Sequence, residues 1–189
     1  MAQFTQKAIM KTFQDMLEVL PFDKITVSAL VKKCEISSNT FYYHYRDIYA
    51  LLDGWLEMEL SCYVPCKPPY EDWKGAAKAM LHDCKGHANV IYHIFNSLSR
   101  DRLERYMFTS TSDFIDTLIQ LHTVGYDIPE ERLQEIADFC RFALIGFFLK
   151  FLWTHMEDDI DSAVDHLGIL FDGFVMQAAK ECPEKEAKK

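Results

Sequence analysis

Apolar residues recur at intervals of three and four along almost the whole chain, which is the spacing of one face of an α-helix. The first such run starts at Ala8 and stops near Pro21. After it, the pattern predicts helices over about 26–34, 37–45, 48–60, 71–84, 87–98, 100–123, 129–156 and 160–181. We find no alternating strand pattern, internal repeat or low-complexity tract. The sequence therefore predicts an all-α protein.

The segment after Pro21 carries two helix-start signals close together. Thr26 and Ser37 each precede a short helical run, where a hydroxyl can accept a hydrogen bond from an orphan backbone N–H. Two short helices that cross at a steep angle can share a small core with a preceding helix. The inward positions of that core are Leu30, Val31, Cys34, Ile36, Phe41 and Tyr45. We infer a three-helix helix-turn-helix domain over residues 1–55.

The outward positions of this segment favour DNA binding. They offer hydroxyls, an amide and aromatic rings on a short helix that has no acid, a surface suited to a groove of base edges and phosphates. Asn39 could bond an adenine edge, and tyrosines could touch thymine methyl groups or donate to phosphate. The candidate DNA-binding residues are Thr26, Ser28, Ser37, Ser38, Asn39, Thr40, Tyr42, Tyr43, His44 and Arg46. The alternative is a helical hairpin in an ordinary bundle, with the aromatic side chains in its core.

The same segment resembles the DNA-binding domain of the tetracycline-repressor (TetR) family. The shared pattern is a capped helix, a three-residue turn and a short helix ending Thr-aromatic-Tyr-x-x-aromatic, matched by Thr26, Leu30, Ile36, Ser37, Thr40, Phe41, Tyr42 and Tyr45. The run NTFYYHYRDI also looks like a subgroup similar to regulators of dihydroxyacetone-kinase operons, some of which act as activators through a protein partner. Two positions depart from the family pattern. Glu35 replaces a turn glycine, which implies strain or an altered turn, and Ile48 replaces a phosphate-binding lysine.

The resemblance implies a C-terminal helical domain that dimerises and binds ligands, which we assign to residues 56–182. Prolines mark a candidate boundary at Val64 to Tyr70, and residues 183–189 look like a flexible tail. The resulting hypothesis is a ligand-responsive homodimeric repressor that binds a palindromic operator in double-stranded DNA. The alternative is a regulator or co-activator that acts through a protein partner docked on the C-terminal domain.

The net charge of −9 is unevenly distributed. Residues 1–55 carry six Lys/Arg and six Asp/Glu, whereas residues 56–189 carry fourteen and twenty-three. A neutral DNA-binding module joined to an acidic body is workable because affinity depends on the local field where phosphates dock. Since six cations are few, we expect salt-sensitive binding that relies on a dimer.

The C-terminal part contains candidates for a small-molecule effector site. An aromatic cavity with a few polar anchors could be lined by Tyr92, Phe95, Asn96, Phe114, His122, Arg141, Phe147 and Phe151. The alternative is that these aromatic residues simply form core. The helices over 129–156 and 160–181 are apolar on more than one face, which favours a homodimer through the last two helices over the core of a monomer.

Other chemistries have little support in the sequence. Metal-ligand atoms occur in His82, Cys84, His87, His93, Cys62 and Cys66, but their spacing matches no recognised zinc motif, so we expect no metal or other cofactor. The glycines are isolated and no catalytic motif is present, so we expect no enzyme activity. The N-terminal residues form no secretory signal, and the apolar runs fall short of the roughly 20 residues that span a bilayer. We therefore expect a cytoplasmic protein without a membrane partner.

Overall fold

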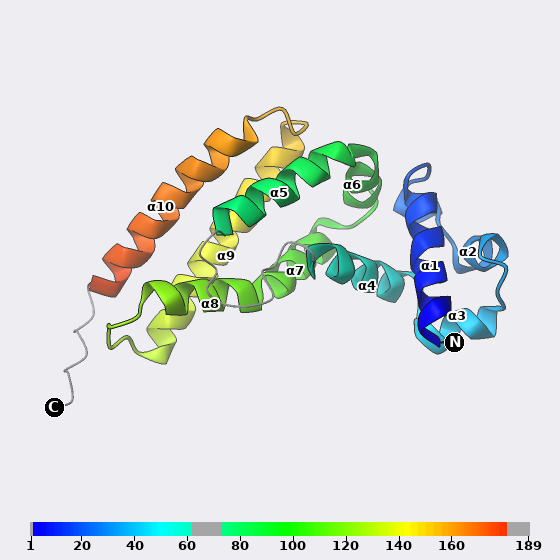
Figure 1. The fold of residues 1–189 in the computed structure, drawn as a ribbon, viewed down its shortest axis with the longest axis horizontal. Coiled ribbons are helices and arrows are strands. Elements are labelled where there is room, and N and C mark those ends of the chain that lie inside the picture. Colours follow the sequence, from blue (N-terminus) through cyan, green and yellow to red (C-terminus); the bar gives the residue numbers. More distant parts are fainter. Residues whose placement is uncertain (1, 62–72, 181–189) are drawn as a thin grey trace. The chain divides into compact units, whose positions relative to one another are not determined.

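The computed structural model describes residues 2–61 and 73–180, and its regular elements there are helices (Figure 1). The all-α class expected from the hydrophobic periodicity is confirmed. The chain divides into two compact units: a first unit of Met1–Tyr63 with His82–Leu103, and a second unit of Val64–Leu81 with Glu104–Lys189. The candidate boundary at 64–70 and the tail at 183–189 lie outside the described residues.

The first unit packs five helices and a short 3-10 turn around one apolar core. Its elements are α1 (Ala2–Leu17), η1 (Phe22–Lys24), α2 (Val27–Lys33), α3 (Ser38–His44), α4 (Ile48–Ser61) and α6 (Ala88–Phe95). Phe13, Leu30 and Phe41 are fully buried at its centre. Val90 and Ile94 of α6 belong to the same core. Helix α6 thus packs with the N-terminal helices, although the sequence interpretation grouped residues 88–95 with the C-terminal part.

The second unit is built mainly from α8 (Ser112–His122), α9 (Glu130–Trp153) and α10 (Ile160–Lys180). The division between the units falls within α5 (Trp73–Gly86) and α7 (Arg100–Ser110). The core of the second unit joins Ile115, Leu118 and Ile119 of α8 to residues of its neighbours: Trp73, Ile136, Ala137, Cys140, Phe171, Val175 and Ala178. No helix in the described part of the chain is both long and apolar enough to cross a bilayer.

Residues 100–123 form two helices, whereas the periodicity predicts one. Thr111 separates α7 from α8. Just before and at the break, the hydroxyls of Thr109, Ser110 and Thr111 each donate to the carbonyl four residues earlier, at 2.9, 2.8 and 2.9 Å. Such bonds compete with the backbone ladder and bend helices. The prediction was wrong here because apolar spacing does not register a run of hydroxyl residues.

Candidate nucleic-acid interface

The two helix caps expected from the sequence are confirmed. The Thr26 hydroxyl accepts a hydrogen bond from the Ala29 amide at 3.2 Å and so starts α2. The Ser37 hydroxyl accepts one from the Thr40 amide at 3.1 Å and starts α3. Each cap satisfies one of the amide groups that a helix leaves without a partner at its N-terminus. Two short helices are therefore fixed at defined starting points.

The turn between α2 and α3 uses a left-handed residue. Glu35 has a φ of 56°, and the Ile36 amide donates to the Val31 carbonyl at 3.1 Å. This bond closes the end of α2 in the manner of a Schellman motif. The conformation that the resemblance assigns to a glycine is thus adopted by a glutamate, at a cost of roughly 1–2 kcal/mol. The turn therefore keeps the left-handed geometry of the family pattern, and the backbone strain at Glu35 is present in the folded protein.

One face of α3 anchors the helix to the core. Phe41 is fully buried and Tyr45, which follows the helix, is 7% exposed. Their rings lie 5.9 Å apart, and both belong to the cluster that contains Leu30 of α2. Burial raises the pKa of Tyr45. The face opposite these anchors is consequently held at a fixed orientation.

The other face of α3 is open to solvent. Ser38, Asn39, Tyr42 and Tyr43 are exposed, the two tyrosines by 56% and 79%. Thr40 and His44 are half-buried at its margins, and the edge of the Tyr43 ring meets the His44 ring at 5.1 Å. Two large aromatic rings on this seven-residue helix are thus left uncovered by the rest of the protein. This face contains polar and aromatic groups and no carboxylate.

The start of α4 carries a cap that the sequence analysis missed. The Asp47 carboxylate accepts hydrogen bonds from the amides of Tyr49 and Ala50 at 2.9 and 2.8 Å, and Arg46 donates to it at 3.1 Å. The pKa of Asp47 is lowered, chiefly by the bond from Ala50. Because Arg46 is paired with this acid, its charge is partly offset. Ile48 stands where the family pattern has a phosphate-binding lysine. Its side chain packs against the core, so this position offers no positive charge to phosphate.

Comparison with known families decides the class of this protein. Residues 71–173, more than half of the chain, match a family of the TetR type described as "Transcriptional regulator C-terminal region". The chain belongs to the TetR family of transcriptional regulators. The resemblance drawn from the N-terminal motif is thereby confirmed through a match in the other part of the chain. It is a transcription regulator.

A solved structure named "Dihydroxyacetone kinase operon activator DhaS" has a similar fold. The TM-score is 0.63 at 17% sequence identity, over 95% of this chain and 98% of that one. At this identity the likeness concerns the fold alone. A search of curated proteins gives no match.

The expected effector-site residues of this TetR-family regulator fall into two groups. Tyr92, Phe95 and Asn96 belong to the first unit. The second unit contains the rest: Phe114, His122, Arg141, Phe147 and Phe151. Asn96 is exposed, Phe151 is 2% exposed, and the remaining aromatic residues are partly buried. The structure thus places the eight residues in two bodies, each with its own core.

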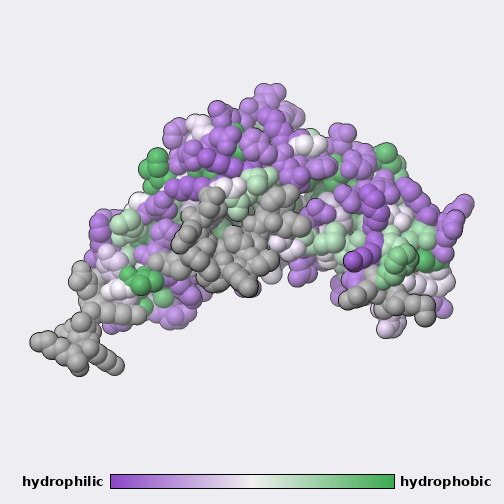
Figure 2. Space-filling view, in the orientation of Figure 1, coloured by the Kyte–Doolittle hydropathy of each residue, from purple (hydrophilic) through white to green (hydrophobic). Residues whose placement is uncertain are grey.

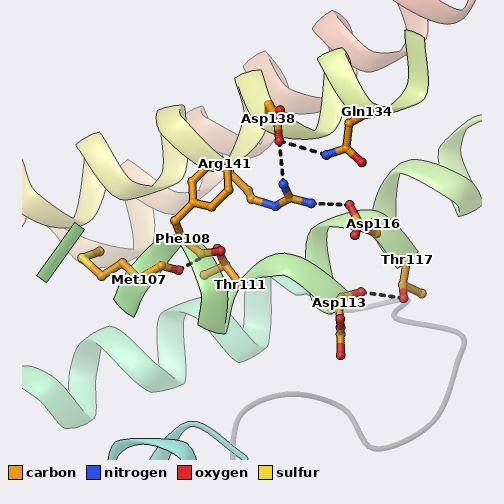
Figure 3. A network of polar contacts seen from close by, with 9 residues as sticks. All are labelled: Met107, Phe108, Thr111, Asp113, Asp116, Thr117, Gln134, Asp138 and Arg141. Atoms are coloured by element: carbon orange, nitrogen blue, oxygen red, sulfur yellow. Dashed lines mark hydrogen bonds and ion pairs between the residues drawn. The ribbon is translucent and has the colours of Figure 1, made fainter. Parts of the chain in front are cut away.

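The two charged or polar anchors of the second unit already have partners in the protein. The Arg141 side chain is 3% exposed and donates to Asp138 at 2.6 Å and to Asp116 at 2.5 Å, so it pins α9 to α8 (Figure 3). The Phe108 ring lies against its guanidinium, 5.1 Å from the centroid (Figure 3). His122 bonds the Leu118 carbonyl at 2.8 Å.

A second polar cluster links α5, α8 and α10, and sequence reasoning missed it. The Asp172 carboxylate lies 3.1 Å from the Lys74 ammonium and 3.3 Å from the His122 Nε2. Gly168 makes room for the lysine, because a Cβ there would collide with the Lys74 side chain. Gly168 lies one helical turn from Asp172, a pattern that could have indicated close packing of another helix. The sequence does not show that this helix is α5.

A surface groove of about 680 Å³ runs between α1 and α4 in the first unit. It is lined by Gln6, Lys7, Met10, Lys11, Gln14, Gly54, Glu57, Met58 and Ser61. None of the eight expected effector residues lines this groove. Its position was not anticipated from the sequence.

The metal alternative has no counterpart in the described part of the chain, where no three potential ligand residues converge. Cys62 and Cys66 lie outside the described residues. Burial raises the pKa of both Cys84 and Cys140 to about 12. Since the thiolate is the nucleophile and the metal ligand, this raised pKa disfavours both roles for the two thiols.

Proposed function

We propose that this TetR-family regulator is a homodimeric repressor that binds a palindromic operator through α3 and responds to a small-molecule effector. The observation that carries the proposal is the division of α3 into two faces. Phe41 and Tyr45 fix the helix to the core, while Asn39, Tyr42 and Tyr43 stand in solvent. A reading helix needs this combination, because side chains that enter the major groove must be exposed yet held in register.

The candidate residues divide by the part of DNA that their chemistry suits. Asn39 offers the bidentate amide that pairs with an adenine edge, and Tyr42 and Tyr43 offer rings for thymine methyl groups and hydroxyls for phosphate. The exposed hydroxyls of Ser28 and Ser38 suit phosphate oxygens. The Thr26 hydroxyl caps α2 as an acceptor, so its proton is still available to phosphate. The hydroxyls of Ser37 and Thr40 lie 2.8 Å apart, so one of them donates to the other and the second can still donate to DNA. His44 and Arg46 complete the set at the far end of α3.

The partner of each chain in this proposal is a second copy, docked on α9 and α10. Phe139 and Phe142 of α9 are 57% and 65% exposed, and Ile169 and Leu170 of α10 are 67% and 71% exposed. Apolar surface of this size is unfavourable in water unless something covers it. Figure 2 shows such apolar atoms over α10 amid a mostly hydrophilic surface. The face is formed by two long helices, as a symmetric four-helix interface requires.

The effector part of the proposal rests on the aromatic residues identified above. In the second unit, Phe114, Phe147 and Phe151 provide apolar surface, and His122 and Arg141 provide polar anchors. His122 and the two terminal nitrogens of Arg141 are bonded within the protein, so an effector that takes one of these donors must exchange its partner. Such an exchange would change the packing of α8 against α9 and shift the population of DNA-competent dimers.

A second candidate is an activator that works through a different protein docked on the same apolar face. The name of the structural relative, an operon activator, favours it. The two candidates differ in the mass of the purified protein: a homodimer has twice the 22.1 kDa chain mass, whereas an activator of this kind gains its partner only when the other protein is added.

The DNA-binding proposal is tested by selection from a random duplex library with the purified protein, followed by titration of the recovered duplex at several salt concentrations. We expect a two-fold symmetric consensus with half-site centres about 34–36 Å apart, and a Kd that rises with salt. Tyr42→Ala should weaken binding by roughly 1–3 kcal/mol. Tyr126→Ala, outside the first unit, is the matched control and should leave it unchanged. Recovery of no consensus would refute the proposal.

A further inference from the structure

The carboxyl end of α1 leaves a backbone carbonyl that the helix itself cannot satisfy. In the helical series the carbonyl of Leu17 would accept from the amide four residues later, which is Pro21. Proline has no N–H. Leu17 is fully buried, so water does not reach its carbonyl oxygen. A buried carbonyl without a donor costs about 1–3 kcal/mol.

His93 of α6 supplies the missing donor. Its Nδ1 lies 2.6 Å from the Leu17 carbonyl oxygen, across 76 positions of sequence. A carbonyl can only accept, so the histidine must carry its proton on Nδ1. The imidazole also stands at the negative end of the α1 dipole, where a donor or a cation is favoured. One hydrogen bond therefore joins α6 to the point where α1 ends.

Apolar contacts hold the same face of α6 against the turn that follows α1. Val90 and Ile94 are buried in the core that also contains Leu17 and Phe22. The Ser97 hydroxyl, one helical turn beyond His93, donates to the His93 carbonyl at 2.6 Å and lies 3.5 Å from the Asp23 carboxylate. The face of α6 thus covers the segment from Leu17 to Asp23.

That segment decides where the DNA-reading helices start. It runs through η1, where the Phe22 ring meets Phe13 at 6.2 Å and Tyr49 of α4 at 5.2 Å. The Ile25 amide closes η1 on the Phe22 carbonyl at 3.0 Å, and Thr26 then caps α2. Only three residues, Asp23 to Ile25, separate Phe22 from this cap. A shift of the end of α1 is therefore passed directly to α2 and, through Leu30 and Phe41, to α3.

We propose that His93 is a positioning residue for DNA binding: its hydrogen bond to Leu17 ties α6 to the turn that orients α2 and α3. The proposal rests on the function proposed above. His93 touches no DNA in this account. It acts by holding the backbone of the α1–α2 turn.

The test compares three variants on the duplex recovered by the wild-type protein. His93→Phe keeps a ring of similar size and removes the donor, whereas His93→Asn places an amide N–H near the position of Nδ1. His82→Phe makes the same change at an exposed histidine of the first unit. All three are first checked for the wild-type circular dichroism spectrum at the assay temperature.

We expect the Kd of His93→Phe for this duplex to rise about tenfold, equivalent to about 1.4 kcal/mol. His93→Asn should remain within threefold of the wild type, and His82→Phe should be unchanged. A folded His93→Phe with the wild-type Kd would overturn the proposal. So would nitrogen NMR of the wild-type protein that finds the only ring proton of His93 on Nε2, a measurement that needs no variant. Failure of the wild type to recover any duplex would instead refute the proposed function.

Discussion

Phe139 of α9 and Phe174 of α10 stack with their ring centroids 4.3 Å apart, although they remain 57% and 37% exposed. The pair joins the two helices into one continuous apolar face, with Leu170 beside it on α10. Stacked aromatic rings contribute more when water is excluded from around them. The uncovered pair lies in the face that we propose meets a second copy of the chain.

We expect Leu170→Glu to dissociate the dimer. Leu170 is 71% exposed, so the substitution leaves the core intact and places a carboxylate in the face proposed to meet a second copy. A buried unpaired charge there is strongly unfavourable. Light scattering coupled to size-exclusion chromatography should give one chain mass for the variant and two for the wild type.

The matched control for this variant is Val124→Glu. Val124 is 76% exposed in the loop after α8, so its replacement also turns an apolar side chain into a carboxylate at similar exposure, outside the proposed face. It should keep the mass of the wild type. If Leu170→Glu is still a dimer, this face of α10 is not part of the interface.

Glu35→Gly should stabilise the protein. Glu35 has a left-handed φ of 56°, which glycine adopts without steric cost. We expect a gain of about 1 kcal/mol in the free energy of unfolding, reduced by the greater freedom of glycine in the unfolded chain. Urea unfolding measures it. A loss of stability would mean that Glu35 makes a contribution that outweighs its backbone strain.

Replacing Tyr43 should lower DNA affinity without lowering stability, whereas replacing the cap residue Ser37 should lower stability. Ser37→Ala removes the cap of α3 and should cost about 1 kcal/mol in stability. Tyr43→Ala alters a side chain that is 79% exposed, so stability should change by less than about 0.5 kcal/mol while DNA binding weakens by roughly 1–3 kcal/mol. Thermal melts and duplex titrations of both variants measure the two effects. Equal loss of stability in both would place Tyr43 in the core.

Removing the positive charge of Arg141 and removing the negative charges of Asp116 and Asp138 should destabilise the protein by different amounts. The arginine side chain is 3% exposed, whereas Asp116 and Asp138 are each 42% exposed. Replacing both acids by Ala leaves a buried guanidinium without a counter-charge, and we expect a loss of about 3–5 kcal/mol. Arg141→Met leaves only carboxylates that water can reach and should cost clearly less. Chemical denaturation gives both values, and the reverse order would contradict this account.

Asp47 should make the first unit sensitive to acid. Its folded-state pKa lies below the ordinary value of 3.8 because amide donors hold the charged form. The sign follows: this stabilisation is complete above the ordinary pKa and is lost as the pH falls through the lower folded-state value. Asp47→Ala should therefore melt at a lower temperature than the wild type near pH 7, and the difference should shrink as the pH falls below the ordinary carboxyl value of 3.8. A constant difference across this range would exclude the carboxylate as its source.

The helix-turn-helix could be predicted from the sequence because its determinants are local. Thr26 and Ser37 act on amides three residues away, and the strain at Glu35 follows from its own backbone. Chain neighbours are known before any fold is known. The core positions Phe41 and Tyr45 follow from helical periodicity alone.

The rest of the molecule depends on contacts between distant residues. His93 looks like any histidine on a helix until the chain brings it to Leu17, and Arg141 looks like a ligand anchor until Asp116 is placed beside it. The break at Thr111 arises from side-chain bonds that compete with the helix, which a count of apolar positions ignores. The DNA-contacting atoms and the effector-site residues remain predictions.

The most direct test of the central claim is the selection of duplex DNA from a random library by the wild-type protein, repeated with Asn39→Ala and Tyr43→Ala. We expect a palindromic consensus for the wild type, and for each variant a loss of preference at particular base pairs in both half-sites. Identical consensus sequences and affinities for all three proteins would show that α3 does not read DNA.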